Sequence, residues 1–598
     1  MSILPELKER FRGALAHLVD HADDLLDLIR RSQDPKFGDY QANLAMPLGK
    51  RLGRPPREVA AEVLQRLDVS DLCRPPEIAG PGFINLRLRD DWLVERLRAA
   101  VRDPRLGVPV VPQPRTCVID YSAPNVAKPM HVGHIRSTVI GDAICRTLRF
   151  LGHRVTSDNH IGDWGTQFGM ILYGYRHFLD PEAYGQDPVQ ELARLYRLVR
   201  QLIDYHEGKL AAAERDPALS KLAAAHRDIA AAVLVETAKL HAGDAENRRL
   251  WREFMPYCLD EIERIYRRLG DSFDYWYGES FYHDWLAPLV DDLLHRKIAE
   301  ESDGAVCVFL EGHGVPMVIR KQDGAFLYAT TDLATIRYRM ETWRPDAILY
   351  VVDHRQSLHF QQLFAAARLL GYKDVELQHV SFGTVLGDDG RPFRTRAGDT
   401  VGLEGLLDEA VRRAAAIVSA NDDAKPDGPE LSPADRQRVA ETVGIAALKY
   451  ADLSQNRTSD YVFSYDKMLA MTGNTATYMQ YAYARVRSIF ARGNVDVEAL
   501  RASGAPILLG APAERALALE LLRFGEALDL MLVDYRPNQL TAYLFDLANR
   551  YSTFFEQCHV LRAETEQLRQ SRLLLCDLTA RTIQKGLELL GINVVEKM

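Results

Sequence analysis

One stretch limits the fold of this chain more than any other. It joins a short apolar run, a polar loop, a helix and a second apolar run. Thr116–Tyr121 is apolar enough for a buried strand, and the loop after it contains Ser-Ala-Pro-Asn. A helix is predicted from about Gly133 to Leu151, and a strand over His153–Ser157. This order predicts the opening of a doubly wound sheet of parallel strands.

The loop before this helix carries groups that favour a bound phosphate. His131 and His134 flank Gly133 at the predicted helix N-terminus, and Lys128 lies three residues before the first histidine. Unpaired backbone N–H groups and the helix dipole attract anions at such an N-terminus. The histidines add donors, and the glycine permits close backbone approach. The string His-x-Gly-His alone is more typical of surface or core residues, so the hypothesis depends on the longer string around it.

The whole chain divides into regions of different pattern, which together predict a multidomain α/β plus all-α protein. Residues 1–110 predict a small α/β domain, and residues 111–400 a Rossmann-like domain with a parallel sheet. A helical insertion at about 176–270 interrupts that domain. Residues 401–440 predict a connecting helical and loop segment, and residues 441–598 an almost entirely helical bundle.

Periodicity and turn residues predict several elements of the N-terminal domain. Apolar residues at helical spacing predict a helix over Leu4–Ile29 and another over Pro56–Leu67. Glu77–Leu88 contains a Gly-Pro-Gly turn followed by an alternating run, which predicts a turn into a strand. Asp103–Pro114 contains four prolines and is predicted to be a linker.

Strand-like runs return after the insertion, so residues 325–400 are predicted to complete the sheet domain. These runs are Val306–Phe309, Met317–Ile319 and Ile348–Val352. Further along, the polar segment Asn421–Ser432 is predicted to be an exposed loop.

Composition constrains the protein's partners and cellular setting. The net charge of −9 does not favour a nucleic-acid partner, but residues 441–598 hold 17 Lys and Arg against 18 Asp and Glu, which leaves room for a local RNA surface. No CxxC pair is present, so the scattered cysteines predict reduced thiols in the cytoplasm. The N-terminus lacks the apolar region of a secretory signal, and no membrane span is expected. The cysteines are Cys73, Cys117, Cys145, Cys258, Cys307, Cys558 and Cys576.

The string SAPNVAKPMHVGHIRSTVIGD, over residues 122–142, resembles the HIGH signature of class I aminoacyl-tRNA synthetases in its arginyl form. The block His160–Gly169 resembles the segment that follows the signature in the arginyl-tRNA synthetase family. The resemblance extends over the N-terminal unit, the sheet domain and the bundle, and is weakest in the helical insertion. It implies ligation of L-arginine to tRNA(Arg) through an arginyl-adenylate, with transfer to the terminal 2′-OH. It also implies ATP with its Mg²⁺, and a monomer.

The resemblance implies an arginine pocket, and the residue types present suit it. A guanidinium is always charged and takes bidentate carboxylate partners. Asp120 ends the first strand, and Asp332 opens a predicted helix, where it could instead be an N-cap or a first-turn acid. His359 could be a further nucleotide-side residue or a surface histidine. The positions that match the family's arginine-binding residues are Asp120, Asn125, Tyr328, Asp332 and Gln356.

The second class I signature, KMSKS, is altered in this chain. The matching segment is residues 390–399, where Arg396 replaces the expected lysine and Arg394 lies beside it. A guanidinium is a planar fork, whereas an ammonium is a compact charge. The resemblance implies that Lys128 supplies the missing charge. It assigns ATP binding to Lys128, His131, Gly133, His134, Arg394 and Arg396, and catalysis to Lys128, His131, His134 and Arg396. A solvated basic loop is the alternative for the two arginines.

Two regions are candidates for RNA binding. Aromatic and arginine side chains can stack on unpaired bases and contact phosphates, although an aromatic stripe at helical spacing is more often core. The resemblance places an anticodon-binding surface in the bundle and a contact to the tRNA D-loop in the N-terminal unit. Phe83 in the core and Asn85 in a turn is the alternative there. The candidates are Phe83, Asn85, Tyr478, Tyr481, Arg485 and Met598.

Two other functions compete with this hypothesis. A class I synthetase for another amino acid, or a related nucleotidylyltransferase, would share the histidine loop but not the two acids. A non-catalytic tRNA-binding relative is opposed by the presence of Lys128, His131 and His134.

Overall fold

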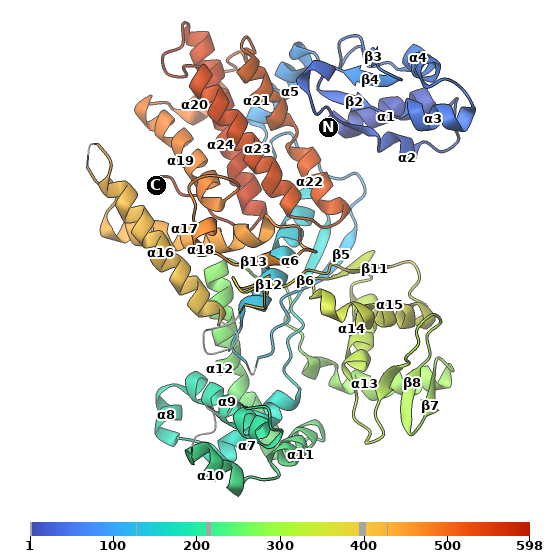
Figure 1. The fold of residues 1–598 in the computed structure, drawn as a ribbon, viewed down its shortest axis with the longest axis vertical. Coiled ribbons are helices and arrows are strands. Elements are labelled where there is room, and N and C mark those ends of the chain that lie inside the picture. Colours follow the sequence, from blue (N-terminus) through green and yellow to red (C-terminus); the bar gives the residue numbers. More distant parts are fainter. Residues whose placement is uncertain (1–2, 127, 211–216, 394–401, 427) are drawn as a thin grey trace.

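The computed structural model describes residues 3–126, 128–210, 217–393, 402–426 and 428–598. A sheet of four parallel strands lies at the centre of the molecule (Figure 1), in the order β11-β10-β5-β6. Its strands are β5 (Thr116–Asp120), β6 (Arg154–Asp158), β10 (Ala347–Tyr350) and β11 (Glu376–His379). The predicted doubly wound parallel sheet is confirmed.

Alternating residues of β5 serve two hydrophobic cores. Cys117 and Ile119 pack into the core that contains α6 (Val132–Leu151), whereas Val118 packs into the opposite one. The opposite core holds α13 (His283–His295), α14 (Tyr328–Thr342) and α15 (Ser357–Leu370). A strand with helices on both faces must be apolar at consecutive positions, which explains the apolar run at residues 117–119. The helix predicted over residues 133–151 is α6.

The predicted helical insertion is confirmed. The long helix α12 returns the chain toward the centre, as Figure 1 shows. The helices of the insertion are α7 (Thr166–Phe178), α8 (Pro181–Gln186), α9 (Pro188–His206), α10 (Pro217–Ala225), α11 (Ile229–His241) and α12 (Ala245–Leu269).

Two of the strand-like runs that follow the insertion belong to a separate antiparallel sheet. It has the order β7-β8-β9, with strands β7 (Ala299–Ser302), β8 (Ala305–Val308) and β9 (Met317–Arg320). Only the run at residues 348–352 enters the parallel sheet, as β10. Two short helices of the 3-10 type flank these elements, η3 (Glu279–Tyr282) and η4 (His354–Gln356).

The N-terminal unit contains a four-stranded sheet of order β1-β2-β4-β3. The single helix predicted over residues 4–29 is wrong, because α1 ends at Leu15 and Ile29 pairs with Ala42 in a strand. Pairing with β2 overrides the helical spacing of the apolar residues there. The elements are α1 (Ile3–Leu15), α2 (Asp23–Leu26), β1 (Ile29–Arg31), η1 (Pro35–Phe37), β2 (Tyr40–Ala42), α3 (Ala45–Leu52), α4 (Pro56–Arg66), β3 (Glu77–Ala79), β4 (Phe83–Leu86) and α5 (Asp90–Arg102).

The C-terminal part is a helical bundle, as predicted. The predicted boundary at residue 440 falls inside α17, and the predicted loop at residues 421–432 begins inside α16. Between these helices and the parallel sheet lies a short parallel ladder of β12 (Val385–Leu386) with β13 (Tyr461–Val462). The helices are α16 (Leu403–Asp423), α17 (Pro433–Leu453), α18 (Tyr465–Met468), α19 (Ala476–Arg492), α20 (Val497–Ala502), α21 (Pro512–Leu522), α22 (Phe524–Val533), α23 (Asn538–Gln557) and α24 (Glu566–Leu589).

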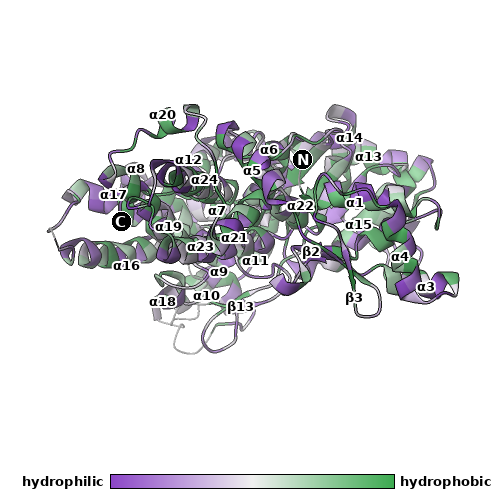
Figure 2. Ribbon diagram, turned by 90° about the horizontal axis from the view of Figure 1, so that it is seen from above, coloured by the Kyte–Doolittle hydropathy of each residue, from purple (hydrophilic) through white to green (hydrophobic). Residues whose placement is uncertain are grey.

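The N-terminal unit lies beside α21 and α22 of the bundle, and the helical insertion lies at the far end of the molecule (Figure 1). Helices at the surface, such as α16 and α3, carry both hydrophilic and hydrophobic residues (Figure 2), as one-sided packing requires. All seven cysteines are buried free thiols. None of the helices in the described ranges has the length and apolarity needed to span a bilayer.

Candidate active site

The two predicted histidines meet at the N-terminus of α6, and the backbone fixes the hydrogen on each ring. The N–H of Gly133 donates to Nδ1 of His131 at 3.1 Å, and the N–H of His131 donates to Nδ1 of His134 at 3.0 Å. Each Nδ1 is therefore an acceptor, so in the neutral rings Nε2 carries the hydrogen. The ring centroids are 4.0 Å apart. The loop thus presents two N–H donors side by side.

Both imidazoles are neutral near pH 7. Burial lowers the pKa of His134 to about 3, and the nearby His131 ring adds to the effect. Burial also lowers the pKa of His131, with further contributions from the charges of Lys128 and Arg355. The histidines therefore act as donors, and a charge for a phosphate must come from elsewhere. Arg355 is a cation near this loop that the sequence analysis did not identify.

Gly133 is required by the histidine ring rather than by its backbone angle. A Cβ at Gly133 would lie 2.9 Å from Cε1 and 3.1 Å from Nδ1 of His131, closer than atoms of these types normally pack. Any side chain there would push the His131 ring off its hydrogen bond. Lys128 is exposed, and its ammonium lies 5.6 Å from the ring centroid of Tyr196 on α9. The Lys128 ammonium, a candidate charge for a phosphate, therefore lies between the histidine loop and the insertion.

The two signature strings pair with each other. Val126 donates its N–H to the carbonyl of Gly162 at 3.1 Å, and Gly162 donates to the carbonyl of Pro124 at 3.0 Å. Asn125 forms the bridge between them with Gly162. The block at residues 160–169 is thereby held against the loop that follows β5.

Asp332 forms an ion pair that the sequence did not predict. Its Oδ2 lies 2.6 Å from Nε2 of His359, the third residue of α15. Burial by itself would lower the pKa of His359, but the hydrogen bond and charge of Asp332 outweigh it and raise that pKa. Asp332 is the fifth residue of α14, and Leu327 is the N-cap, so the helix-cap alternative is wrong.

A second acid, Glu279, lies close to Asp332. Burial raises the pKa of Glu279 to about 7, with contributions from the charges of Asp163 and Asp332, while His160 acts in the opposite direction. Tyr328 is 65% exposed at the start of α14, and Glu279 and Asp332 both raise its pKa in addition to burial. No periodic or motif signal along the chain marks Glu279, because only the fold brings it close to Asp332.

Asp120 lies at the end of β5, where its charge already has a partner. Nη2 of Arg339 donates to Oδ2 of Asp120 at 2.6 Å and to Oδ2 of Asp158 at 2.8 Å. Arg339, from α14, is fully buried, as is Asp158. Two carboxylates around one guanidinium form the anchor of α14 on the ends of β5 and β6. Arg339 was not predicted, because nothing in the sequence around it distinguishes it from the other arginines of α14.

The remaining predicted pocket residue, Gln356, ends η4 at the carboxyl edge of the sheet. Its backbone N–H donates to the carbonyl of Asp353 at 3.1 Å, and the side chain is exposed. Because β10 pairs with β5 in parallel, the loops after both strands emerge at the same edge. Gln356 and the histidine loop therefore share one side of the sheet.

The altered signature loop begins and ends beside this site. Phe393 donates its N–H to the carbonyl of Val385 at 3.0 Å, and Leu403 donates to the carbonyl of Met130 at 2.8 Å. Gly402 bridges to His131. Arg394 and Arg396 lie outside the described residues.

The predicted RNA-contacting residues lie in two separate parts of the molecule, and Asn85 is buried in the first of them, with only 9% of its surface exposed. Phe83 and Asn85 both belong to β4, so the alternative of a turn for Asn85 is wrong. On α19, Tyr481 is 42% exposed and the Arg485 guanidinium lies 4.1 Å from the ring centroid of Phe555. Tyr478 is partly buried against the bundle core, and its hydroxyl contacts Asn549.

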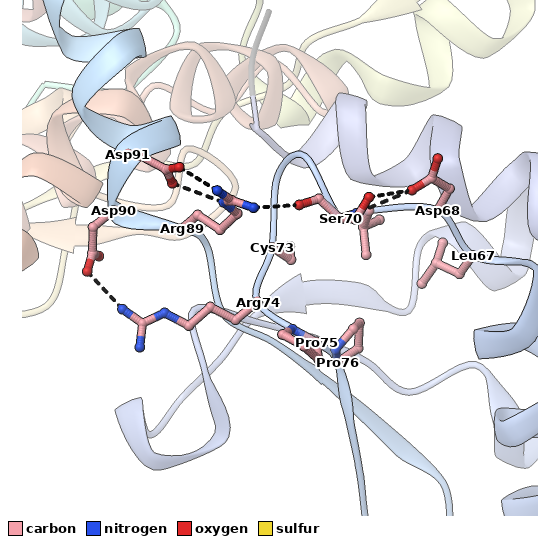
Figure 3. Close-up of a pocket in the computed structure, with 11 residues that line it drawn as sticks. Leu67, Asp68, Ser70, Cys73, Arg74, Pro75, Pro76, Arg89, Asp90 and Asp91 are labelled. Atoms are coloured by element: carbon pink, nitrogen blue, oxygen red, sulfur yellow. Dashed lines mark hydrogen bonds and ion pairs between the residues drawn. The ribbon is translucent and has the colours of Figure 1, made fainter.

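A cavity of about 670 Å³ lies in the N-terminal unit (Figure 3). Arg89 pairs with Asp91 there, and Arg74 pairs with Asp90. None of the residues that line it is a predicted site residue.

Three family models match consecutive parts of the chain. Residues 97–465 match class I (R) tRNA synthetases, catalytic domain. Residues 479–598 match the DALR anticodon binding domain, and residues 5–88 match the arginyl tRNA synthetase N terminal domain.

Relatives and solved structures match over the full length. The chain is 49% identical to an arginine--tRNA ligase of Rhodopirellula baltica over 99% of both chains, and 44% identical to one of Cellvibrio japonicus over 100% of both. The arginyl-tRNA synthetase of Plasmodium falciparum has a TM-score of 0.83 at 27% identity, covering 100% of this chain and 99% of that one. The Thermus thermophilus enzyme has a TM-score of 0.80 at 26% identity, covering 100% of both.

Proposed function

The chain belongs to the arginyl-tRNA synthetase family, and from that membership we propose how its own residues perform the reaction. The protein is an enzyme that ligates L-arginine to tRNA(Arg) with ATP. The single observation that supports our assignment of the catalytic loop is the pair of neutral imidazoles whose Nε2–H groups are left free by the backbone bonds to Nδ1.

In the first step, a carboxylate oxygen of arginine forms a bond to the α-phosphorus of ATP, and the bond from that phosphorus to the bridging oxygen of pyrophosphate breaks. Negative charge spreads over the phosphoryl oxygens in the transition state. We assign His131 and His134 as donors to these oxygens, at a helix N-terminus that favours anions. Lys128 and Arg396 supply positive charge toward the leaving pyrophosphate, and Arg394 assists them.

Arginine recognition is assigned to the acids at the ends of α14 and η3. Asp332 lies close enough to Glu279 for its charge to raise the pKa of Glu279, and a guanidinium takes carboxylates on more than one edge. Tyr328 covers the aliphatic stem. Asn125 and Gln356 bind the α-amino and carboxylate end, next to the histidine loop. Asp120 acts mainly by holding Arg339, and hence α14, at the strand ends.

In the second step, the terminal adenosine 2′-OH of the tRNA attacks the arginyl carbonyl, an ester forms and AMP leaves. Phe83 and Asn85 contact the D-loop, and Tyr478, Tyr481, Arg485 and Met598 belong to the anticodon-binding surface. Mg²⁺ enters with ATP and is held mainly by phosphate oxygens and water; within the described ranges, no group of three or more His, Cys, Asp or Glu side chains is arranged to hold a metal ion. We further propose that the enzyme works as a monomer, in the cytoplasm where its substrates are.

ATP–pyrophosphate exchange with each of the standard amino acids, with and without tRNA(Arg), tests this proposal. We expect exchange with arginine alone among them, and dependence on the tRNA. Exchange with a different amino acid would favour another class I specificity. No exchange with any amino acid in the presence of tRNA(Arg) would favour a non-catalytic tRNA-binding protein.

A further inference from the structure

Asp39 and the first two residues of β2 reach two different parts of the molecule. Asp39, which directly precedes β2, and Tyr40 contact α21 and α22 of the bundle, whereas Gln41 contacts Asn85 of β4. Tyr40 and Gln41 lie on opposite faces of the sheet because successive side chains of a strand alternate. One face of β2 therefore meets the bundle, and the other carries the contact of Gln41 with Asn85.

The Asp39 carboxylate is held by an arginine of the bundle. Arg515 of α21 donates from Nη1 and Nη2 to the two Asp39 oxygens, at 2.9 and 2.8 Å. The same guanidinium donates from Nε to Asp90 at 2.7 Å and from Nη2 to the carbonyl of Leu88 at 2.9 Å. Asp90 also borders the cavity in Figure 3. A bidentate pair fixes orientation as well as distance.

Tyr40 adds a second, buried connection. Its hydroxyl donates to Oε1 of Glu526 at 2.7 Å, and Arg523 donates to the same hydroxyl at 3.3 Å. Arg523 also donates to the carbonyl of Asp39 at 3.0 Å. Arg31 of β1 lies 3.3 Å from Glu526 and from Glu520. The N-terminal sheet is thus bound beside β2 by two arginines of the bundle, Arg515 and Arg523, and two of its glutamates, Glu520 and Glu526.

On the opposite face, Gln41 contacts the proposed D-loop residue. The side chain of Gln41 donates from Nε2 to Oδ1 of Asn85 at 2.8 Å. The two residues are direct partners in the pairing of β2 with β4, with Arg30 and Glu77 opposite them on the outer strands. Phe83 lies two residues from Asn85 on β4, and so on the same face. An amide that is engaged through its oxygen presents its N–H₂ group to a ligand.

We propose that β2 is a rigid link between the two RNA-reading surfaces, in which Arg515 and Gln41 are positioning residues for Asn85. Arg515 fixes β2, and with it the sheet, on the anticodon-binding bundle. Gln41 fixes the amide of Asn85 so that its N–H₂ group meets an acceptor on an unpaired base of the D-loop. This inference rests on the proposed D-loop contact of Asn85.

The arrangement explains why so many polar groups are buried between these two units. Two domains joined by a flexible linker would have to pay the entropy of alignment each time a tRNA binds. A tRNA that contacts both surfaces gains from the second contact only if the distance between them is already correct. The bonds of Arg515 and Tyr40 set that distance before the RNA arrives.

A double-mutant cycle on tRNA aminoacylation tests this link. Asn85→Ala should raise the KM for a tRNA(Arg) transcript about 10-fold in the otherwise native enzyme, the usual effect of one base contact. In an Arg515→Gln or a Gln41→Leu background, the same substitution should change KM less than about 3-fold. The kcat at saturating tRNA should stay within about 2-fold throughout.

Arg581→Gln is the matched control. Arg581 of α24 also ties the N-terminal side to the bundle, through the carbonyls of Val101 and Asp103, but at the far end of α5 from β2. In that background the effect of Asn85→Ala should be undiminished. An undiminished effect in Arg515→Gln and Gln41→Leu would overturn this inference alone. A native KM for Asn85→Ala would overturn both this inference and the D-loop contact. Gln41→Leu, on the outer face, provides the test if Arg515→Gln fails to fold.

Discussion

At the scale of single residues, we propose that the histidine loop works through the ring nitrogen that each imidazole leaves free. Backbone N–H groups occupy both Nδ1 atoms, so the chemistry depends on Nε2. Because burial keeps the His134 ring neutral, this donor is present over the whole physiological pH range.

Substitution of His134 distinguishes the two ring nitrogens. His134→Gln carries an amide N–H₂ near the position of Nε2, whereas His134→Asn reaches only the position of Nδ1. We expect His134→Asn to lower kcat for arginine activation about 100-fold or more, the usual loss for one transition-state donor. His134→Gln should retain more activity than His134→Asn, measured by pyrophosphate exchange with tRNA present. Equal loss in both variants would mean that the ring acts by packing alone.

The acids of the proposed arginine pocket predict that arginine binding depends on pH. Glu279 has a pKa of about 7, raised by burial and by Asp163 and Asp332. Since guanidinium favours the ionised acid, arginine binding should release a proton, and the KM for arginine should fall as pH rises from about 6 to 8. His359 acts in the same direction. Its protonated ring pairs with Asp332 below pH 6.5, and this pair is lost as pH rises through the raised pKa of His359, which leaves Asp332 available to arginine.

Glu279→Gln should flatten this profile. The variant should have a KM for arginine about 10-fold or more above the native value at pH 8, as expected for a lost charged hydrogen bond, and nearly the native value at pH 6. In the absence of arginine, ionisation of Glu279 lowers the stability of the folded protein. Because folding raises the pKa of this carboxyl, the free energy of unfolding falls as pH rises from its ordinary pKa of 4.5 through about 7. A native dependence of the KM for arginine on pH in Glu279→Gln would show that Glu279 does not belong to the pocket.

At the scale of elements, the position of α6 on β5 decides where the histidines lie. Tyr121 directly follows β5, and its ring packs against Gly141 of α6. A Cβ at residue 141 would overlap that ring, so only glycine allows the helix to approach the strand so closely.

Gly141→Ala should therefore move α6. We expect a loss of about 1–3 kcal/mol in unfolding free energy from overpacking, and a fall in kcat through displacement of the histidine loop. Thermal unfolding and pyrophosphate exchange measure the two effects. Gly13→Ala is the control, because a Cβ there would meet no atom within 4 Å in α1. It should stabilise slightly, by up to about 1 kcal/mol. Native activity in Gly141→Ala would show that α6 tolerates the shift.

At the scale of the whole molecule, buried charges connect the signature helix to the bundle. Nε of Arg136, on α6, lies 3.0 Å from Oδ2 of Asp452 on α17, and both side chains are buried. Arg136 also donates to the carbonyl of Ser459 at 3.1 Å and lies over the ring of Tyr461 in β13. β13 pairs with β12, which leads into the altered signature loop. One guanidinium thus contacts the bundle and the base of that loop from α6.

Arg136→Met should be strongly destabilising, by about 3–5 kcal/mol, because it leaves Asp452 buried without its partner. The double variant Arg136→Met with Asp452→Leu should recover much of that loss, since an apolar pair can replace a buried ion pair. Thermal unfolding of the three proteins checks the expectation. If the double variant were no more stable than Arg136→Met, the bonds of Arg136 to Ser459 and Tyr461 would be the important ones.

The sequence by itself determined the class of fold and the location of the loop that we propose binds phosphate. Both depend on information that is local in the chain: a strand, a loop and a helix in order, with histidines at fixed positions beside the helix N-terminus. The helical character of the insertion and of the bundle was likewise predictable, because apolar residues repeat with the period of one helix. The helix over residues 4–29 was wrong, since strand pairing depends on a partner distant in sequence.

Only the tertiary structure decided which charges meet. Glu279, Arg339 and Arg515 carry no signal in their neighbours along the chain that predicts their partners, and the pairing of His359 with Asp332 carries none either. The separation in sequence is 219 residues for Arg339 with Asp120 and 476 for Arg515 with Asp39. Electrostatic interaction depends on distance in space and on burial. Neither quantity is fixed until the helices have packed on the sheet.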